Sequence, residues 1–278
     1  AQLERFFGEH LGGRYQTDAT PAIQARLDSL RQDVSAVTLP DTTETASTAP
    51  DGVAALDGST LSPATLKYKT KLQLGQQTMN RPTTRVLRTA THDGQSVWQI
   101  ADAAQGGAQT DTLLVDRSSL RPLQRSASGR GTVSLAFTDT TVSGTMKARG
   151  REIPVEKSFD QPTLASTANM EVALAALPFE AGYAAQLPVF QLQQQKVAKT
   201  TVRVTGTETV TVPAGSFETY VLETTSEGPG PSGTIYVRKA APHHVVKADL
   251  EVSMGPRTVT AKKRLTKMTT DASTSEME

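Results

Sequence analysis

Histidine is the side chain in this sequence best suited to metal binding or to proton transfer near neutral pH. The chain contains four, His10, His92, His243 and His244. His243 and His244 are neighbours at the start of an expected strand, so their side chains point to opposite faces and cannot both bind one metal ion without distortion. We expect both to be partly exposed at the start of that strand. His92 precedes an Asp-Gly turn, and His10 lies in an expected helix. No histidine and carboxylate show metal-ligand spacing, and we expect no bound metal.

Few residues of this chain are suited to nucleophilic or acid–base catalysis. It contains no cysteine, which excludes thiol chemistry, and no G-x-S-x-G elbow that would present a catalytic serine. Carboxylates from different strands could pair, and the candidates are Glu208, Glu218, Glu223 and Asp249. Exposed faces of strands explain these four more simply. We predict a non-enzyme without catalytic residues or cofactor.

Composition restricts the partners. The 29 basic residues balance 28 acidic residues to a net charge of +1, so no long-range field favours nucleic acid. No segment approaches the roughly 20 apolar residues of a membrane-spanning helix. The absence of cysteine suits a protein of the bacterial periplasm or cell envelope.

A period of two in hydrophobicity dominates the chain from Leu61 onward. In the segment ATLKYKTKLQL, one face carries Leu66, Tyr68, Leu72 and Leu74. The other face carries Lys67, Lys69, Lys71 and Gln73. Segments of this kind recur about twelve times between turn signals, which predicts a large antiparallel β-barrel or half-barrel. Besides ATLKYKTKLQL, they are TTRVLRTATHDGQSVWQIAD, which reads as two strands, DTLLVD, GTVSLAF, TTVSGTMKA, TTVRVTGTETVTV, FETYVLETT, GTIYVRK, HHVVKADLEVSM and RTVTAKKRL.

The segment VPAGSFETYVLE, residues 212–223, reads as a hairpin rather than a reactive loop. Pro213 presets φ for the first central position of the turn, and Gly215 suits a position of positive φ. Ser216 has no base nearby in the sequence. A second tight turn is expected at Asp93-Gly94.

The remaining segments set the domain limits. Residues 1–40 predict a short helical segment, residues 41–60 a linker rich in small and polar residues, and residues 61–268 the β-domain. Residues 169–179 predict a short helix within it. Residues 269–278 predict a disordered polar tail.

Large side chains on both faces of some strands favour a barrel too wide to be filled by its own side chains. The residues that we expect to line such a cavity are Trp98, Phe217, Tyr220, Leu222 and Tyr236. The bound molecule would be a lipid, a peptide or another apolar ligand. The alternative is that these residues form an ordinary packed core.

The VPAG(S/T)F hairpin, followed by GTIYVRKAAPHHVVKADLEV, resembles uncharacterised exported bacterial β-domains. These are similar in shape to the LolA- and LppX-like envelope proteins, which hold lipid in a half-open barrel. The resemblance covers about residues 61–266 and includes LLVDRSSLRPLQRSASGRGTVSLAF. It implies a fold and an envelope location more strongly than an activity.

The segments FFGEHLGGRYQ and PAIQARLDSLRQDVSAVTL in residues 1–40 resemble the end of prolyl-oligopeptidase-like serine peptidases. The catalytic residues of that family precede such a helix, so the resemblance implies that this chain follows a peptidase domain. His10 lies within the helix and cannot inherit the role of the catalytic histidine.

Three functions remain open at this point. The first is a non-catalytic domain that binds a ligand or a partner protein in the bacterial envelope. The second is a part that completes or regulates a serine peptidase covalently linked upstream. The third is a structural spacer or docking domain.

Overall fold

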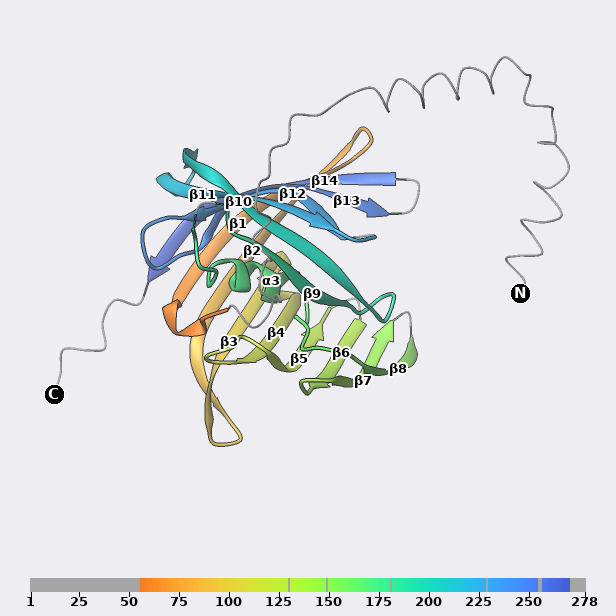
Figure 1. Ribbon diagram of the computed structural model, residues 1–278. Helices are drawn as coiled ribbons and strands as arrows, with labels where there is room; N and C mark the ends of the chain where they lie inside the picture. Colours follow the sequence, from red (N-terminus) through yellow and green to blue (C-terminus); the bar gives the residue numbers. More distant parts are fainter. Residues whose placement is uncertain are drawn as a thin grey trace, which may run out of the picture. The chain divides into compact units, whose positions relative to one another are not determined.

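One antiparallel sheet of 14 strands forms almost the whole of the β-domain. The computed structural model describes residues 56–129, 131–148, 150–180, 182–228, 230–254 and 257–270. The strand order is β8-β7-β6-β5-β4-β3-β2-β1-β14-β13-β12-β11-β10-β9. The sheet coils into an open half-barrel (Figure 1). The predicted β fold is therefore confirmed.

The chain order of the elements follows a simple series of hairpins. The first eight strands are β1 (Ala64–Leu74), β2 (Gln77–His92), β3 (Gln95–Ala104), β4 (Gln109–Asp116), β5 (Pro122–Ser128), β6 (Gly131–Phe137), β7 (Thr141–Ala148) and β8 (Arg151–Ser158). The last six are β9 (Ala184–Gln191), β10 (Lys196–Val212), β11 (Gly215–Ser226), β12 (Pro231–Arg238), β13 (Val245–Met254) and β14 (Arg257–Thr270). Helix α3 (Thr167–Leu174) separates the two series, and two short 3-10 helices are η2 (Gly58–Thr60) and η3 (Gln105–Gly107).

The first and last strands of the domain join the two series. β1 pairs with β14 along its whole length, from Ala64 opposite Thr270 to Leu74 opposite Val259. Because β1 also pairs with β2, side chains from all three strands form continuous rows across the sheet.

Both predicted turns have the expected geometry. Asp93 and Gly94 have φ angles of 49° and 77°, which both central positions of a type I′ hairpin turn require. In the VPAG segment, Val212 pairs with Gly215 across the turn, and Gly215 has a φ of 132°. The segment connects β10 to β11, and its interpretation as a hairpin is confirmed.

Three of the strands that contain proline are absent from the strands expected from periodicity. β5 begins with Pro122, while Pro154 and Pro188 lie within β8 and β9. Proline cannot donate a ladder hydrogen bond, so sheets accept it at the first residue of a strand or in an edge strand. β8 and β9 are the two ends of the sheet, which explains how the fold accepts both prolines.

Helix α3 packs against the concave side of the sheet. Ser166 caps its first turn, and the Ser166 side chain accepts a hydrogen bond from the Asn169 amide at 3.3 Å. The helix contacts β3, β9 and β13, so it touches both series of strands (Figure 1). A helix was expected over residues 169–179; it starts two residues earlier and ends at Leu174. No helix in the described ranges has the length and hydropathy needed to cross a bilayer.

The hydrophobic side chains form two clusters. The larger one lies between the concave face and α3 and includes Trp98, Leu113, Leu135, Phe190 and Leu222. The smaller one gathers residues from β1, β10, β13 and β14, namely Ala64, Leu66, Tyr68, Val210, Val212, Val246 and Leu265. Two separate clusters explain why several strands carry large residues on both faces.

Both ends of the described β-domain are part of the sheet or pack on it, and the expected domain limits stay predictions. Leu56 is buried and the Trp98 indole donates a hydrogen bond to the Gly58 carbonyl at 2.9 Å, so the end of the expected linker 41–60 packs on the sheet. β14 continues through Thr270, two residues into the expected tail 269–278. Residues 1–55 and 271–278, which include the helical segment predicted for 1–40, lie outside the described residues.

Candidate functional site

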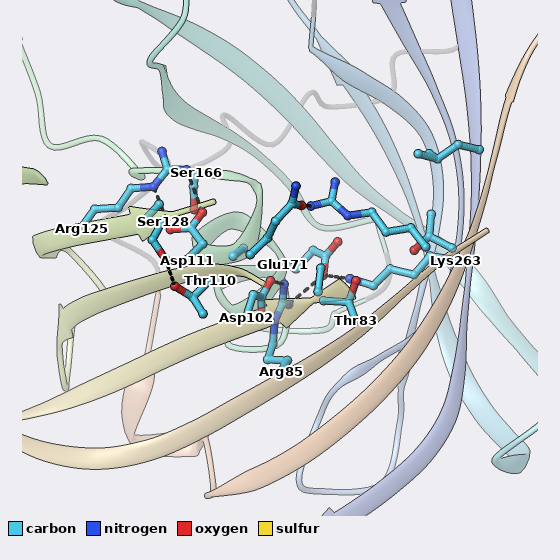
Figure 2. A pocket seen from close by; sticks show the side chains of 17 residues that line it. Thr83, Arg85, Asp102, Thr110, Asp111, Arg125, Ser128, Ser166, Glu171 and Lys263 are labelled. Atoms are coloured by element: carbon cyan, nitrogen blue, oxygen red, sulfur yellow. Dashed lines mark hydrogen bonds and ion pairs between the residues drawn. The ribbon is translucent and has the colours of Figure 1, made fainter. Parts of the chain in front are cut away.

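A polar cavity of about 430 Å³ opens on the concave side of the sheet. Its walls come from β1 to β5, α3 and β14, and Figure 2 shows charged side chains from several of these elements turned toward it. Four basic and three acidic residues line it, namely Arg81, Arg85, Arg125, Lys263, Asp102, Asp111 and Glu171.

Arg85 is the centre of the first group of charges. It lies on β2 directly opposite Asp102 on β3, so the two side chains share a face of the sheet. Its Nε and Nη2 atoms donate to the two carboxylate oxygens of Asp102, each at 2.7 Å. Its Nη1 atom donates to Glu171 Oε2, also at 2.7 Å (Figure 2). Planar two-point pairing of this kind fixes the orientation of both side chains.

Glu171 connects this arginine to the opposite wall. It projects from α3, and its Oε2 atom also accepts a hydrogen bond from Lys263 Nζ on β14 at 2.6 Å. The Lys263 ammonium lies 4.1 Å from the ring centroid of Tyr68, a cation–π contact. The Tyr68 hydroxyl donates to the Val245 carbonyl at 2.9 Å. Thus the helix is attached to both β2 and β14 through one carboxylate.

The ion pairs set the charge of this group. Burial alone would raise the pKa of Glu171, but the charges of Lys263 and Arg85 and their hydrogen bonds outweigh it and lower the pKa to about 2. Burial lowers the pKa of Lys263, although Glu171 opposes that shift. Burial also raises the pKa of the Tyr68 hydroxyl well above its ordinary value. Glu171 is therefore ionised at neutral pH.

A second ion pair lies on the other side of the same cavity. Arg125 on β5 donates to both carboxylate oxygens of Asp111 on β4, at 3.0 and 2.8 Å. It also donates to the Ala165 carbonyl at 3.2 Å, just before α3. Figure 2 shows this pair apart from the Arg85 group.

Arg81 differs from the other three cations of the cavity. It is exposed on β2, and it donates one hydrogen bond to the Gln109 side chain at 3.0 Å. Over the described parts of the chain, no carboxylate forms an ion pair with it. The cavity lining therefore carries one more basic side chain than acidic side chains, and Arg81 is the one without an acidic partner among the described residues.

A larger groove of about 710 Å³ shares Arg81, Arg125, Glu171 and Lys263 with the polar cavity. Its further walls carry the apolar side chains of Val133, Met146, Met170, Val189, Phe190, Leu192, Leu250, Val252 and Ala261, together with the polar side chains of Gln191, Gln193, Gln194, Thr200 and Ser226. The concave side therefore combines a charged region with an apolar region in one accessible space. Pockets of this size accept small organic molecules.

Comparison with known families assigns this fold. The family described as protein of unknown function (DUF3108) matches residues 64–262. This range covers most of the chain and the whole sheet except the last residues of β14. The chain belongs to the DUF3108 family. A search of curated proteins found no match for this DUF3108 chain.

Two solved structures are similar to this DUF3108 domain in outline. One is a β-barrel-like protein of domain of unknown function DUF1849 from Brucella abortus, with 12% identity and a TM-score of 0.44 over 78% of this chain and 99% of that chain. The other is described as "a putative lipoprotein" from Parabacteroides distasonis, with 9% identity and a TM-score of 0.29 over 77% of this chain and 99% of that chain. The serine-peptidase resemblance of residues 1–40 lies outside the described residues and stays a prediction.

The five residues expected to bind a ligand do not come together in the DUF3108 domain. Trp98 and Leu222 are buried in the larger cluster, whereas Phe217 and Tyr236 pack against the smaller one. Tyr220 stacks on Phe179, with ring centroids 4.4 Å apart and an interplanar angle of 6°. None of the five lines the polar cavity or the groove. Their role in ligand binding stays a prediction.

The histidines are placed differently from one another. The His243 ring lies edge-on to Phe179, and its Nδ1 is 2.9 Å from the Arg238 carbonyl oxygen. His244 is buried, so its expected partial exposure is wrong. Burial, with the charges of Arg238 and His243, lowers its pKa to about 4.

His92 is half-buried beside Asp93. In the described ranges, no three histidine or acidic side chains meet closely enough to hold a metal ion. His10 lies outside those ranges.

Of the four carboxylates considered for acid–base chemistry, only Glu208 and Glu218 line one pocket of the DUF3108 domain among the described residues, a small one of about 120 Å³ that they share with Lys239. Glu208, Glu218 and Glu223 are exposed on β10 and β11. Asp249 on β13 accepts a hydrogen bond from Arg264 at 2.7 Å. These placements agree with their interpretation as residues of exposed strand faces.

Sequence reasoning did not identify Arg85, Asp102, Glu171 and Lys263. Their positions lie far apart in the chain. The register of β2 with β3 sets Arg85 opposite Asp102, β1 connects β2 to β14 with Lys263, and the packing of α3 adds Glu171. One signal was available: Glu171 is the single charged residue in the helix segment TANMEVAL. A lone acid in a buried helix requires a basic partner.

Proposed function

We propose that this domain is a non-catalytic binding protein for an amphipathic anion, a molecule with an acyl chain and a carboxylate or phosphate head. The groove of about 710 Å³, whose lining joins apolar side chains from several strands to the basic side chains of Arg81, Arg125 and Lys263, is the observation that carries the proposal. The location in the bacterial envelope that the sequence favours stays part of it. The peptidase-linked and spacer functions have no observation among the described residues in their favour.

The apolar walls of the groove support an acyl chain as the buried part of the ligand. Phe190, Leu250 and Val252 come from β9 and β13, and Met146 and Val133 face them from β7 and β6. Each methylene that leaves water contributes roughly 0.8 kcal/mol. Affinity should therefore depend on chain length.

The charged region supports an anionic head. Arg85, Arg125 and Lys263 already pair with carboxylates, whereas Arg81 has only the Gln109 side chain as a partner in the described structure. An anion beside Arg81 would complete the pairing of charges in the cavity. Arginine suits this role because its planar donors match a carboxylate or phosphate.

The same geometry supports binding without catalysis. Glu171 is held ionised by two cations, so it has no proton to donate and little basicity near neutral pH. The Ser166 hydroxyl of the cavity lining accepts the capping hydrogen bond of α3 and has no adjacent base in the structure. Nothing in the cavity activates a nucleophile.

The test is a titration of lipid-free protein with fatty acids of 8 to 16 carbons and with the matching fatty alcohols. We expect saturable binding that strengthens by up to about 15-fold for every two methylenes, and a preference for the acid over the alcohol. Arg81→Gln should weaken acid binding by about tenfold and leave alcohol binding unchanged.

Arg88→Gln is the matched control for that variant. Arg88 is an exposed arginine on the same strand, and its side chain donates to Gln99 rather than lining the groove. It should bind the acids as the unchanged protein does. Absence of saturable binding, or equal affinity for acids and alcohols in every variant, would contradict the proposed function.

A further inference from the structure

The convex face of β1 and β14 carries basic residues directly opposite one another. Lys67 pairs with Lys267, Lys69 with Arg264, and Lys71 with Lys262. We call this set the basic stripe: Lys67, Lys69, Lys71, Lys262, Arg264 and Lys267. Like charges directly opposite on neighbouring strands are destabilising, so the register alone would disfavour three such pairs.

Almost all charges of the basic stripe lack an acidic partner among the described residues. All five of its lysines are exposed. Within the described parts of the chain, none of the five forms an ion pair, and only Arg264 has an acidic partner, Asp249. Alternate residues of a strand are ~7 Å apart, so the cations lie within one Debye length of each other at physiological salt. The net charge of the whole chain is only +1, and so the positive field is local.

An apolar tip lies at the end of the same strands. Met79, on the β1–β2 hairpin, is 60% exposed, the most exposed large hydrophobic side chain among the described residues. Its cross-strand partner is Leu72, which lines the apolar groove. β2 extends past its neighbour β3, whose pairing with β2 begins at Thr83, and the hairpin is orange in Figure 1. Apolar surface therefore continues from the groove to the tip.

We propose that the basic stripe docks the domain on a membrane surface of anionic phospholipid, with the Met79 tip in contact with the lipid. The docking itself is independent of the proposed function. Docking also offers an acyl chain a route from the membrane along Met79 and Leu72 into the groove. This route rests on the proposed function.

A lipid surface fits the basic stripe better than a nucleic acid does. The stripe is a flat array on two adjacent strands, and its face of β1 carries no aromatic side chain between the lysines, because Tyr68 points to the other side. Single-stranded nucleic acid is bound mainly by stacking on aromatic side chains in a basic groove. Juxtaposed lysines near an anionic bilayer need no such stacking.

The experiment measures co-sedimentation with vesicles of phosphatidylcholine alone and with 30% phosphatidylglycerol. We expect binding only to the anionic vesicles and a steep decrease with salt. The triple variant Lys67→Gln, Lys69→Gln, Lys71→Gln should bind them about 100-fold more weakly, at about fivefold for each lysine near the surface. The control Lys147→Gln, Lys157→Gln, Lys196→Gln changes the same charge at exposed lysines of other strands and should bind as the unchanged protein does.

Several outcomes would overturn the docking proposal. Equal binding to neutral vesicles would do so, as would equal losses in the two triple variants or tighter binding to single-stranded DNA than to the vesicles. The fatty-acid titration of the β1 triple variant separates the two proposals. It should be unchanged, since Lys67, Lys69 and Lys71 do not line the groove.

A second variant tests the contact of the tip. Met79→Trp should show a blue-shifted emission and quenching by brominated lipid when anionic vesicles are added. The natural Trp98 is buried, so its signal provides an unchanging baseline. An emission that vesicles leave unchanged would remove the tip from the proposal.

Discussion

Lys262 and Lys263 are consecutive residues of β14 whose side chains lie on opposite faces of the sheet. Lys263 points to the concave side, where Glu171 and the Tyr68 ring contact its ammonium. Lys262 points to the convex side, exposed and directly opposite Lys71. Inside the half-barrel the buried charges of Arg85, Glu171 and Lys263 compensate one another, since the cost of an unpaired buried charge is large. On the convex face water screens the exposed lysines, and Lys262 forms no ion pair among the described residues.

The largest expected effect comes from removing the shared acid of the concave side. Glu171→Ala leaves Arg85 and Lys263 buried with less negative charge, and we expect a loss of about 3–5 kcal/mol in the free energy of unfolding. Asp249→Ala, which removes the acid beside Arg264 on the convex face, should cost less than about 1 kcal/mol. Urea unfolding of both variants measures the difference. Equal losses would mean that the two faces do not differ in this way.

An intermediate effect is expected from acid. The pKa of Glu171 falls from its ordinary 4.5 to about 2 in the folded protein, so its contribution to stability is fully present above pH 4.5 and is lost as the pH falls toward 2. The amount lost is on the order of 3 kcal/mol. Urea unfolding at a series of pH values should show this loss in the unchanged protein but not in Glu171→Gln. A Glu171→Gln variant with the same acid dependence would contradict the assignment.

The smallest effect is expected on the convex face. Lys69→Glu replaces a repulsive pair with Arg264 by an attractive one, and we expect a gain of about 0.2–1 kcal/mol that decreases at high salt. Thermal unfolding at 50 mM and 500 mM salt measures it. If Lys69→Glu lowers the stability, the stripe contains an attraction that the register does not reveal.

The fold could be predicted in outline from alternation alone. Hydrophobic period two identified most of the strands, and the Asp93-Gly94 and Pro213 turns fixed the positions of two hairpins. β5, β8 and β9 were missed because proline weakens the strand signal, and only the place of β8 and β9 at the ends of the sheet makes Pro154 and Pro188 acceptable.

The candidate site could not be predicted, and the reason is the distance between its parts in the sequence. Arg85, Asp102, Glu171 and Lys263 lie on β2, β3, α3 and β14, and no local pattern encodes their meeting. Large residues on both faces suggested a wide cavity lined by aromatics. The structure instead divides Trp98 and Tyr236 between two clusters, because strands of a strongly coiled sheet pack on both sides.

The two ends of the sheet come close without joining. The Gln195 side chain, in the turn after β9, donates to the Pro154 carbonyl of β8 at 3.2 Å, and the Phe159 and Phe190 rings pack beside it with centroids 5.6 Å apart. Among the described strands, no backbone ladder links β8 to β9. In the segment after β8, Leu164 forms a backbone bridge with Val189 of β9. Widening the circumference of the half-barrel would therefore break the contacts between β8 and β9, and every interstrand ladder would survive the change.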